Sequence, residues 1–108
     1  MAAAILIYTT AGSPAEAEAI AETVIGQGLA ACANIFPAMT SVYRWKGEIA
    51  RETETAMILK TVPAHRDAAM DAVRACHPYE TPAILALPVE KVDAAYLSWL
   101  LAETDSAG

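Results

Sequence analysis

Residues 29–61 read LAACANIFPAMTSVYRWKGEIARETETAMILKT and contain the patterns of two long β-strands. Side chains of alternating character over residues 29–36 predict a β-strand. Pro37 interrupts this pattern and indicates a bulge or an edge position. Gly47 marks a turn, after which residues 49–61 return as a second strand. The two strands make a hairpin arm that is too long for a 108-residue core to cover, so we expect the arm to pack on another subunit.

The residues before the arm predict a strand followed by a helix. Residues 5–10 form a short apolar and β-branched run, which is typical of a strand. In the segment GSPAE, residues 12–16, Ser13 can cap a helix and Glu16 completes a capping box. Apolar residues then recur at helical spacing, and two glycines end the helix before the arm begins.

The residues after the arm predict a helix, a strand and a final helix. The second helix opens at Val62 and ends before Pro78, because a residue that precedes proline disfavours helix. Residues 83–89 are nearly all apolar, which predicts a strand that is buried on both faces. Asp93 caps the last helix. The resulting order, β-α-β-β-α-β plus a C-terminal helix, predicts an α+β protein with the ferredoxin-like pattern, in one domain over residues 1–108.

Composition and charge exclude several classes of partner. The net charge is −6, from 13 acidic and 7 basic residues, and no basic patch is present. Phosphate contacts need clustered lysine and arginine, so we expect no nucleic acid partner. No apolar run approaches the roughly 18–20 residues of a membrane span. The N-terminal MAAAILIYTT lacks the basic leader of a secretory signal, and we therefore expect a cytoplasmic protein.

The segment CHPYETP, residues 76–82, admits three interpretations. As a catalytic nucleophile, Cys76 would need a base and an oxyanion hole, but neighbours in regular structure point apart. As metal ligands, Cys76 and His77 suit copper or zinc, although two ligands are fewer than a structural zinc site requires. As a stiff turn, the segment would pack Tyr79 and use Glu80 to bond exposed amides. The residues alone favour the turn and do not predict an enzyme.

Two other groups of side chains are candidates for chemistry. Cys32 lies in an apolar strand, which predicts an inert thiol in the core. In YRWKGE, the aromatic Tyr43 and Trp45 alternate with cations, a pattern that can bind nucleic acid. With only two cations in an acidic chain, we expect these aromatics to pack on a neighbouring subunit instead.

Four motifs together resemble the CutA divalent-cation tolerance family. They are LAACANIFPAMTSVYRWKGEI, ILKT, HPYETP and YLSWL, and the resemblance runs from about Ile5 to Leu100. It implies a ferredoxin-like protomer in a tight homotrimer, whose long hairpin strands join those of neighbouring subunits. The trimer would resemble that of PII signalling proteins, which bind small effectors in clefts between subunits. The resemblance also implies tolerance of copper and other divalent metals, with no established reaction and no obligatory cofactor.

The family's ligands carry over to this chain only in part. His77 matches the histidine of the HPY motif, and Cys76 stands where some members have a second histidine. Cys32 matches the cysteine of the ACxN strand and is the less favoured ligand. Thr9 stands where some members have a cysteine, and Ala83 stands where the family commonly has a glutamate.

Two functional hypotheses follow from the resemblance. In the first, a homotrimer binds copper or another divalent cation through Cys76 and His77. In the second, a PII-like trimer binds a small effector or a protein partner in its clefts and has no specific metal site. The departures at Thr9 and Ala83 favour the second. The cleft residues implied by the resemblance are Lys60, Tyr79, Glu80, Tyr43 and Trp45.

Overall fold

A four-stranded antiparallel sheet forms the frame of the protein, with strand order β2-β3-β1-β4. In the computed structural model, which describes residues 1–104, the strands are β1 (Ala4–Ala11), β2 (Cys32–Trp45), β3 (Glu48–Thr61) and β4 (Ile84–Val89). The helices are α1 (Pro14–Gly26), α2 (Arg66–Cys76, after a 3-10 turn at Pro63–His65) and α3 (Ala94–Thr104). This order confirms the predicted α+β, ferredoxin-like pattern with its C-terminal helix.

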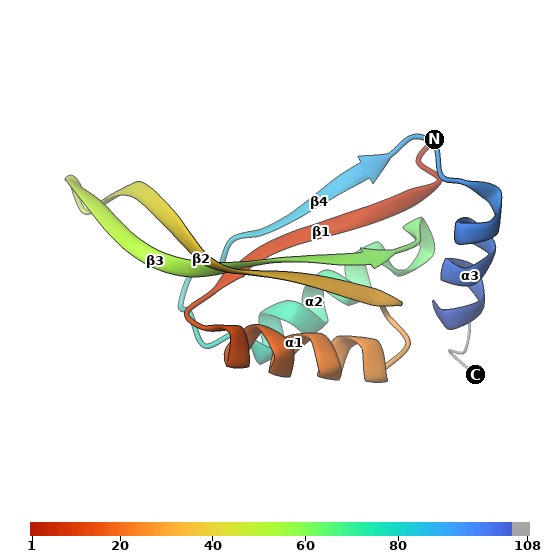
Figure 1. Ribbon diagram of the computed structural model, residues 1–108, viewed down its shortest axis with the longest axis horizontal. Helices are drawn as coiled ribbons and strands as arrows, with labels where there is room; N and C mark the ends of the chain where they lie inside the picture. Colours follow the sequence, from red (N-terminus) through yellow and green to blue (C-terminus); the bar gives the residue numbers. More distant parts are fainter. Residues whose placement is uncertain (105–108) are drawn as a thin grey trace.

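The helices are divided between one face of the sheet and one end of it. Helices α1 and α2 lie on the same face, and α3 lies at the end opposite the β2–β3 arm (Figure 1). The core between the sheet and helices α1 and α2 includes Ile5, Ile7, Met57, Leu59, Ile20, Val24, Ala69 and Val73. None of the helices in residues 1–104 is long and apolar enough to cross a membrane.

The predicted cap at the start of α1 is confirmed, except that the Glu16 side chain bonds to the residue before Ser13 rather than to Ser13 itself. The Ser13 hydroxyl accepts a hydrogen bond from the Glu16 N–H at 3.2 Å. The Glu16 carboxylate in turn accepts from the Gly12 N–H at 3.0 Å, one residue before the cap itself. This pair of bonds fixes the path of the chain from the end of β1 into α1.

The last strand, β4, is exposed on the face of the sheet that points away from α1 and α2, contrary to the prediction. Strand β4 was expected to be buried on both faces, but Leu85 is 52% exposed and Leu87 is 45% exposed. The reason is that β4 is an edge strand and that helices α1 and α2 both lie on the other side of the sheet. We call this surface the open face; its central residues are Leu6, Tyr8, Ile58, Leu85 and Leu87, which line a hollow of about 180 Å³.

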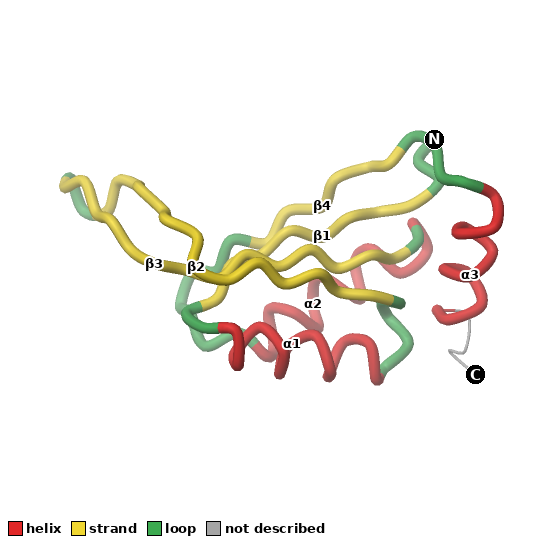
Figure 2. Tube along the Cα trace, viewed as in Figure 1, coloured by secondary structure: helices red, strands yellow, loops and turns green. Residues whose placement is uncertain are grey.

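The predicted hairpin arm is present and projects well beyond the core (Figure 2). A bulge or an edge position was expected at Pro37, and both are present: the pairing of β2 with β3 shifts between Phe36 and Met39, and β2 is an edge strand. The arm turns at Lys46 and Gly47, both of which have positive φ, as the left-handed two-residue hairpin turn requires. Apolar side chains remain exposed along the arm, and Ile49 is 73% exposed.

Cys32 is not the core thiol that its apolar neighbourhood suggested. It begins β2, pairs in register with Lys60 and is partly exposed. Lys60 pairs with Leu6 in turn, so the three residues form a row across the open face. Alternation along β2 separated the two faces correctly, but only Ala33 and Ile35 pack against the core.

Candidate functional site at the base of the arm

His77 ties the CHPYETP segment to the end of β1. Its ring Nε2 lies 2.7 Å from the carbonyl oxygen of Thr10, and its Nδ1 accepts a hydrogen bond from the Tyr79 N–H at 3.2 Å. Because Nδ1 accepts, the proton of the neutral ring is on Nε2 and is donated to Thr10. Both ring nitrogens are therefore engaged within the chain.

Tyr79 continues this link from the segment to the arm. Its ring packs against that of His77, with centroids 4.6 Å apart, and its hydroxyl donates to the Glu54 carboxylate at 3.0 Å. Partial burial, followed by the bond to Glu54 and the charges of Glu54, Glu16 and Glu52, raises the pKa of Tyr79 to about 12. The phenol therefore keeps its proton and remains a donor to Glu54 across the neutral range.

A second tyrosine–carboxylate pair lies further along the arm. The Tyr43 hydroxyl donates to the Glu52 carboxylate, and this bond is the largest cause that raises the pKa of Tyr43. Glu52 and Glu54 are two residues apart on β3, so their side chains leave the same face of the strand. One carboxylate at the base of the arm and one further along it are thus each held by a phenol.

The two predicted metal ligands have different surroundings. Cys76 ends α2 as an exposed free thiol, whereas His77 is partly buried and already hydrogen bonded. Within residues 1–104, no group of three or more His, Cys, Asp or Glu side chains is placed to hold a metal ion. Cys32 lies opposite Lys60 in the sheet, four residues along β3 from the Ala56 that pairs with Thr10. That separation is about 13 Å along the strand, so Cys32 does not join the other two predicted ligands.

The five predicted cleft residues lie far apart in the folded chain, from the tip of the arm to the end of the sheet beside α3. Tyr79 lies at the base of the arm and Tyr43 lies on the arm. Trp45 is exposed near the tip of the arm. Glu80 is exposed in the segment after α2. Lys60 lies at the other end of β3, where its Nζ is 3.3 Å from the hydroxyl of Tyr96 in α3. A single chain therefore brings Tyr79 close to Glu54 but does not bring Lys60 to them.

Thr9 and Ala83, the two residues at which this chain departs from the family motifs, lie at opposite extremes of burial. Thr9 is fully buried on the helix side of β1, between Met57 and Ile84 in the register. Its hydroxyl has no hydrogen-bond partner in the described part of the chain. Ala83 is exposed immediately before β4. Neither side chain adds a ligand to Cys76 and His77.

Sequence reasoning did not find the partners of the CHPYETP segment. The Thr10 carbonyl and the Glu54 and Glu16 carboxylates all lie at the base of the arm, but they come from distant parts of the chain. The one available signal was the alternation of acids in RETET, residues 51–55, which places Glu52 and Glu54 on one face of a strand.

The sheet order, the projecting β2–β3 arm and the tied loop at its base define a small ferredoxin-like α+β protein with a hairpin extension. Residues 5–103 match the family described as CutA1 divalent ion tolerance protein, and the chain belongs to this family. The resemblance seen in the four sequence motifs is thereby confirmed. The chain accordingly belongs among proteins of divalent-cation tolerance, which are not known as a family of enzymes.

Relatives match the chain over most of its length. The divalent-cation tolerance protein CutA of Salmonella newport (strain SL254) is 44% identical over 97 residues, which are 90% of this chain and 84% of that protein. The crystal structure of CutA1 from Ehrlichia chaffeensis has a TM-score of 0.91 at 38% identity and covers 96% of this chain and 97% of its own. The periplasmic divalent cation tolerance protein CutA from Archaeoglobus fulgidus has a TM-score of 0.90 at 42% identity, covering 94% and 98%.

Proposed function

We propose that this chain acts in divalent-cation tolerance as a cytoplasmic homotrimer that binds metal ions through the exposed thiol of Cys76 and the ring of His77. The observation that carries the proposal is the position of Cys76, a free and exposed thiol adjacent to a histidine in a chain of this family. Thiolate and imidazole together suit copper and zinc. No obligatory cofactor is part of the proposal.

Metal binding at this place would compete with the hydrogen bonds of His77. The ring must give up either Thr10 or the Tyr79 N–H before one of its nitrogens can coordinate. Both ligands must also be deprotonated, so the affinity should rise with pH. The site is therefore expected to be an exchangeable one, with its remaining ligands supplied by water or by another chain.

The trimer is supported by the open face and by the arm. The hollow bounded by Leu6, Tyr8, Ile58, Leu85 and Leu87 is lined by apolar atoms. Contiguous apolar surface of this kind is typical of sites of association. The arm adds an exposed hairpin that pairing with a neighbour would cover.

A reducing compartment is supported by the cysteines. Cys32 and Cys76 are both free thiols, and free thiols are the usual state in the cytoplasm.

The test is a calorimetric titration of the reduced protein with Zn²⁺, which does not oxidise thiols, followed by Cu²⁺. We expect saturable binding that is lost in Cys76→Ser and in His77→Ala. Cys32→Ser is the matched control, because Cys32 lies apart from the other two, and it should bind as the parent does. Binding that is equally strong in all three variants would contradict the proposed ligands.

A second candidate, a PII-like trimer that binds a small effector or a protein partner, is favoured by one observation. Both nitrogens of His77 are engaged within the chain, which leaves Cys76 as the free member of the pair. This candidate predicts weak Zn²⁺ binding that is indifferent to the three substitutions. The same titration therefore separates the two candidates.

A further inference from the structure

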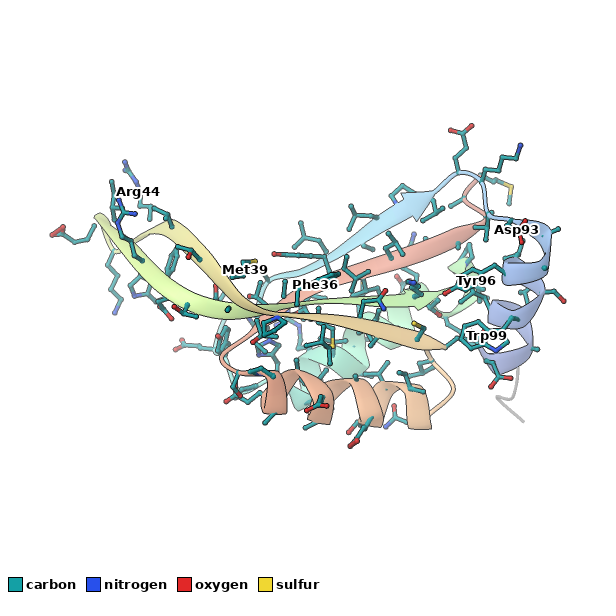
Figure 3. The ribbon with its side chains drawn as sticks, viewed as in Figure 1. Phe36, Met39, Arg44, Asp93, Tyr96 and Trp99 are labelled. Atoms are coloured by element: carbon teal, nitrogen blue, oxygen red, sulfur yellow. The ribbon has the colours of Figure 1, made fainter. Side chains whose placement is uncertain are left out.

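A second hollow lies between α3 and the adjoining ends of β1 and β4, away from the base of the arm. It has a volume of about 210 Å³. Its apolar wall comes from both strands and from α3, and includes Leu6, Val89, Val92 and Leu100. Its polar lining residues are Lys60, Lys91 and Tyr96. Figure 3 shows Tyr96 on the side of α3 that faces the sheet.

Two cations lie beside this mainly apolar hollow, although the protein as a whole is acidic. The chain contains three lysines and carries a net charge of −6, yet two of the three lysines line this one hollow. The ion pair present in residues 1–104 joins Arg66 to Asp67, so neither pocket lysine is paired with a carboxylate there. Lys60 uses one of its three donors toward the Tyr96 hydroxyl, and its ammonium lies 5.5 Å from the centre of the same ring.

We infer that this pocket binds a small organic anion, namely a carboxylate with a compact apolar body. The apolar wall would cover the body, and Lys60 and Lys91 would donate to the carboxylate. The volume is below the roughly 300–1,000 Å³ of sites for drug-sized ligands, so the ligand is small. The pocket takes an anion, so the inference does not depend on the metal role proposed above. Lys60 is also a cleft residue of the PII-like candidate, and the inference rests on that candidate by naming the chemical class of its small effector.

Benzoate is a suitable probe, because it joins a carboxylate to a small apolar ring, and benzamide is its uncharged counterpart. The experiment is a titration of the ¹⁵N-labelled full chain, followed by amide NMR shifts at constant ionic strength. We expect saturable shifts at Leu6, Lys91 and Tyr96 with benzoate, and affinity for benzamide at least about tenfold weaker.

Three lysine variants provide the matched comparison. Lys60→Gln and Lys91→Gln should each weaken benzoate binding by about tenfold or more. Lys46→Gln is the control, since Lys46 is the third lysine and lies at the arm turn beside Trp45. It should leave the affinity unchanged.

Several results would overturn the inference. They are equal affinity for benzoate and benzamide, shifts outside the pocket, a failure to saturate, or the same loss of affinity in Lys46→Gln. The comparison of the two probes uses the parent protein alone, so it decides the matter even if a variant does not fold. Because no metal is added, a negative result here leaves the Zn²⁺ titration unaffected.

Discussion

The imidazole of His77 donates from Nε2 to the carbonyl oxygen of Thr10, 67 residues earlier in the chain, at 2.7 Å. The end of β1 and the segment after α2 lie where the arm leaves the core (Figure 1), and this bond joins them. The segment whose role was ambiguous between a turn and a metal site is thus held in place by its own histidine. Any ligand role of His77 has to be gained at the expense of this bond or of the one from the Tyr79 N–H.

The first prediction concerns the stability that this bond provides. His77→Ala leaves the Thr10 carbonyl and the Tyr79 N–H without their partner, and we expect a loss of about 1–3 kcal/mol in the free energy of unfolding. Urea denaturation at fixed protein concentration measures it. Cys76→Ala is the control, since an exposed thiol should change stability by less than about 0.5 kcal/mol. Equal effects of the two substitutions would show that the His77 bonds contribute nothing.

The second prediction concerns alkaline pH and Tyr79. Its folded-state pKa of about 12 lies above the ordinary value of 10, so above pH 10 the unfolded chain loses this proton before the folded one does. The contribution of Tyr79 to stability is then complete below pH 10 and is lost as the pH rises toward 12. An ultraviolet titration of tyrosinate checks this. Tyr79→Phe should remove the part of the tyrosinate absorbance change that occurs near pH 12. If the substitution instead removes absorbance change near pH 10, the pKa of Tyr79 is not raised.

The third prediction compares two buried threonines of the sheet. The Thr9 hydroxyl has no partner in residues 1–104, whereas the Thr61 hydroxyl donates to the Leu29 carbonyl at 2.6 Å. Thr9→Val should raise the free energy of unfolding by about 1 kcal/mol, and Thr61→Val should lower it by about 1–3 kcal/mol. Thermal or urea unfolding of the pair gives the answer. The account of Thr9 fails if both substitutions destabilise equally.

The fourth prediction tests the open face as the surface of self-association. Leu85→Asp places a charge beside Tyr8 and Ile58, and we expect it to convert the proposed trimer to monomers. Sedimentation equilibrium measures the change in mass. Ala68→Asp on the exposed side of α2 is the control and should keep the parent mass. If Leu85→Asp also keeps it, the open face is not where the chains meet.

Local patterns predicted the secondary structure well, because each signal acts over a few residues. The bulge at Pro37, the turn at Gly47 and the cap at Ser13 are all in place. Alternation also separated the two faces of β2 correctly. Alternation does not indicate which face of the sheet the chain's own helices cover. For that reason Cys32 and the outer side of β4 were expected to be buried, whereas both are at least partly exposed.

The candidate site was less predictable, because its bonds join distant segments. The sequence singled out Cys76, His77 and Tyr79. The partner of His77 is Thr10 in β1 and the partner of Tyr79 is Glu54 in β3, both far from the segment in the sequence. No local pattern signals a bond across 67 residues. Only the assembled sheet places these groups side by side.

The most direct test of the proposed metal site is X-ray absorption spectroscopy of the reduced protein with one equivalent of Zn²⁺ per chain. We predict one sulfur neighbour at about 2.3 Å and at least one imidazole nitrogen at about 2.0–2.1 Å. Both should disappear from the spectrum of the Cys76→Ser, His77→Ala double variant. A shell made only of oxygen, identical in the parent and the variant, would contradict the assignment of Cys76 and His77 as ligands.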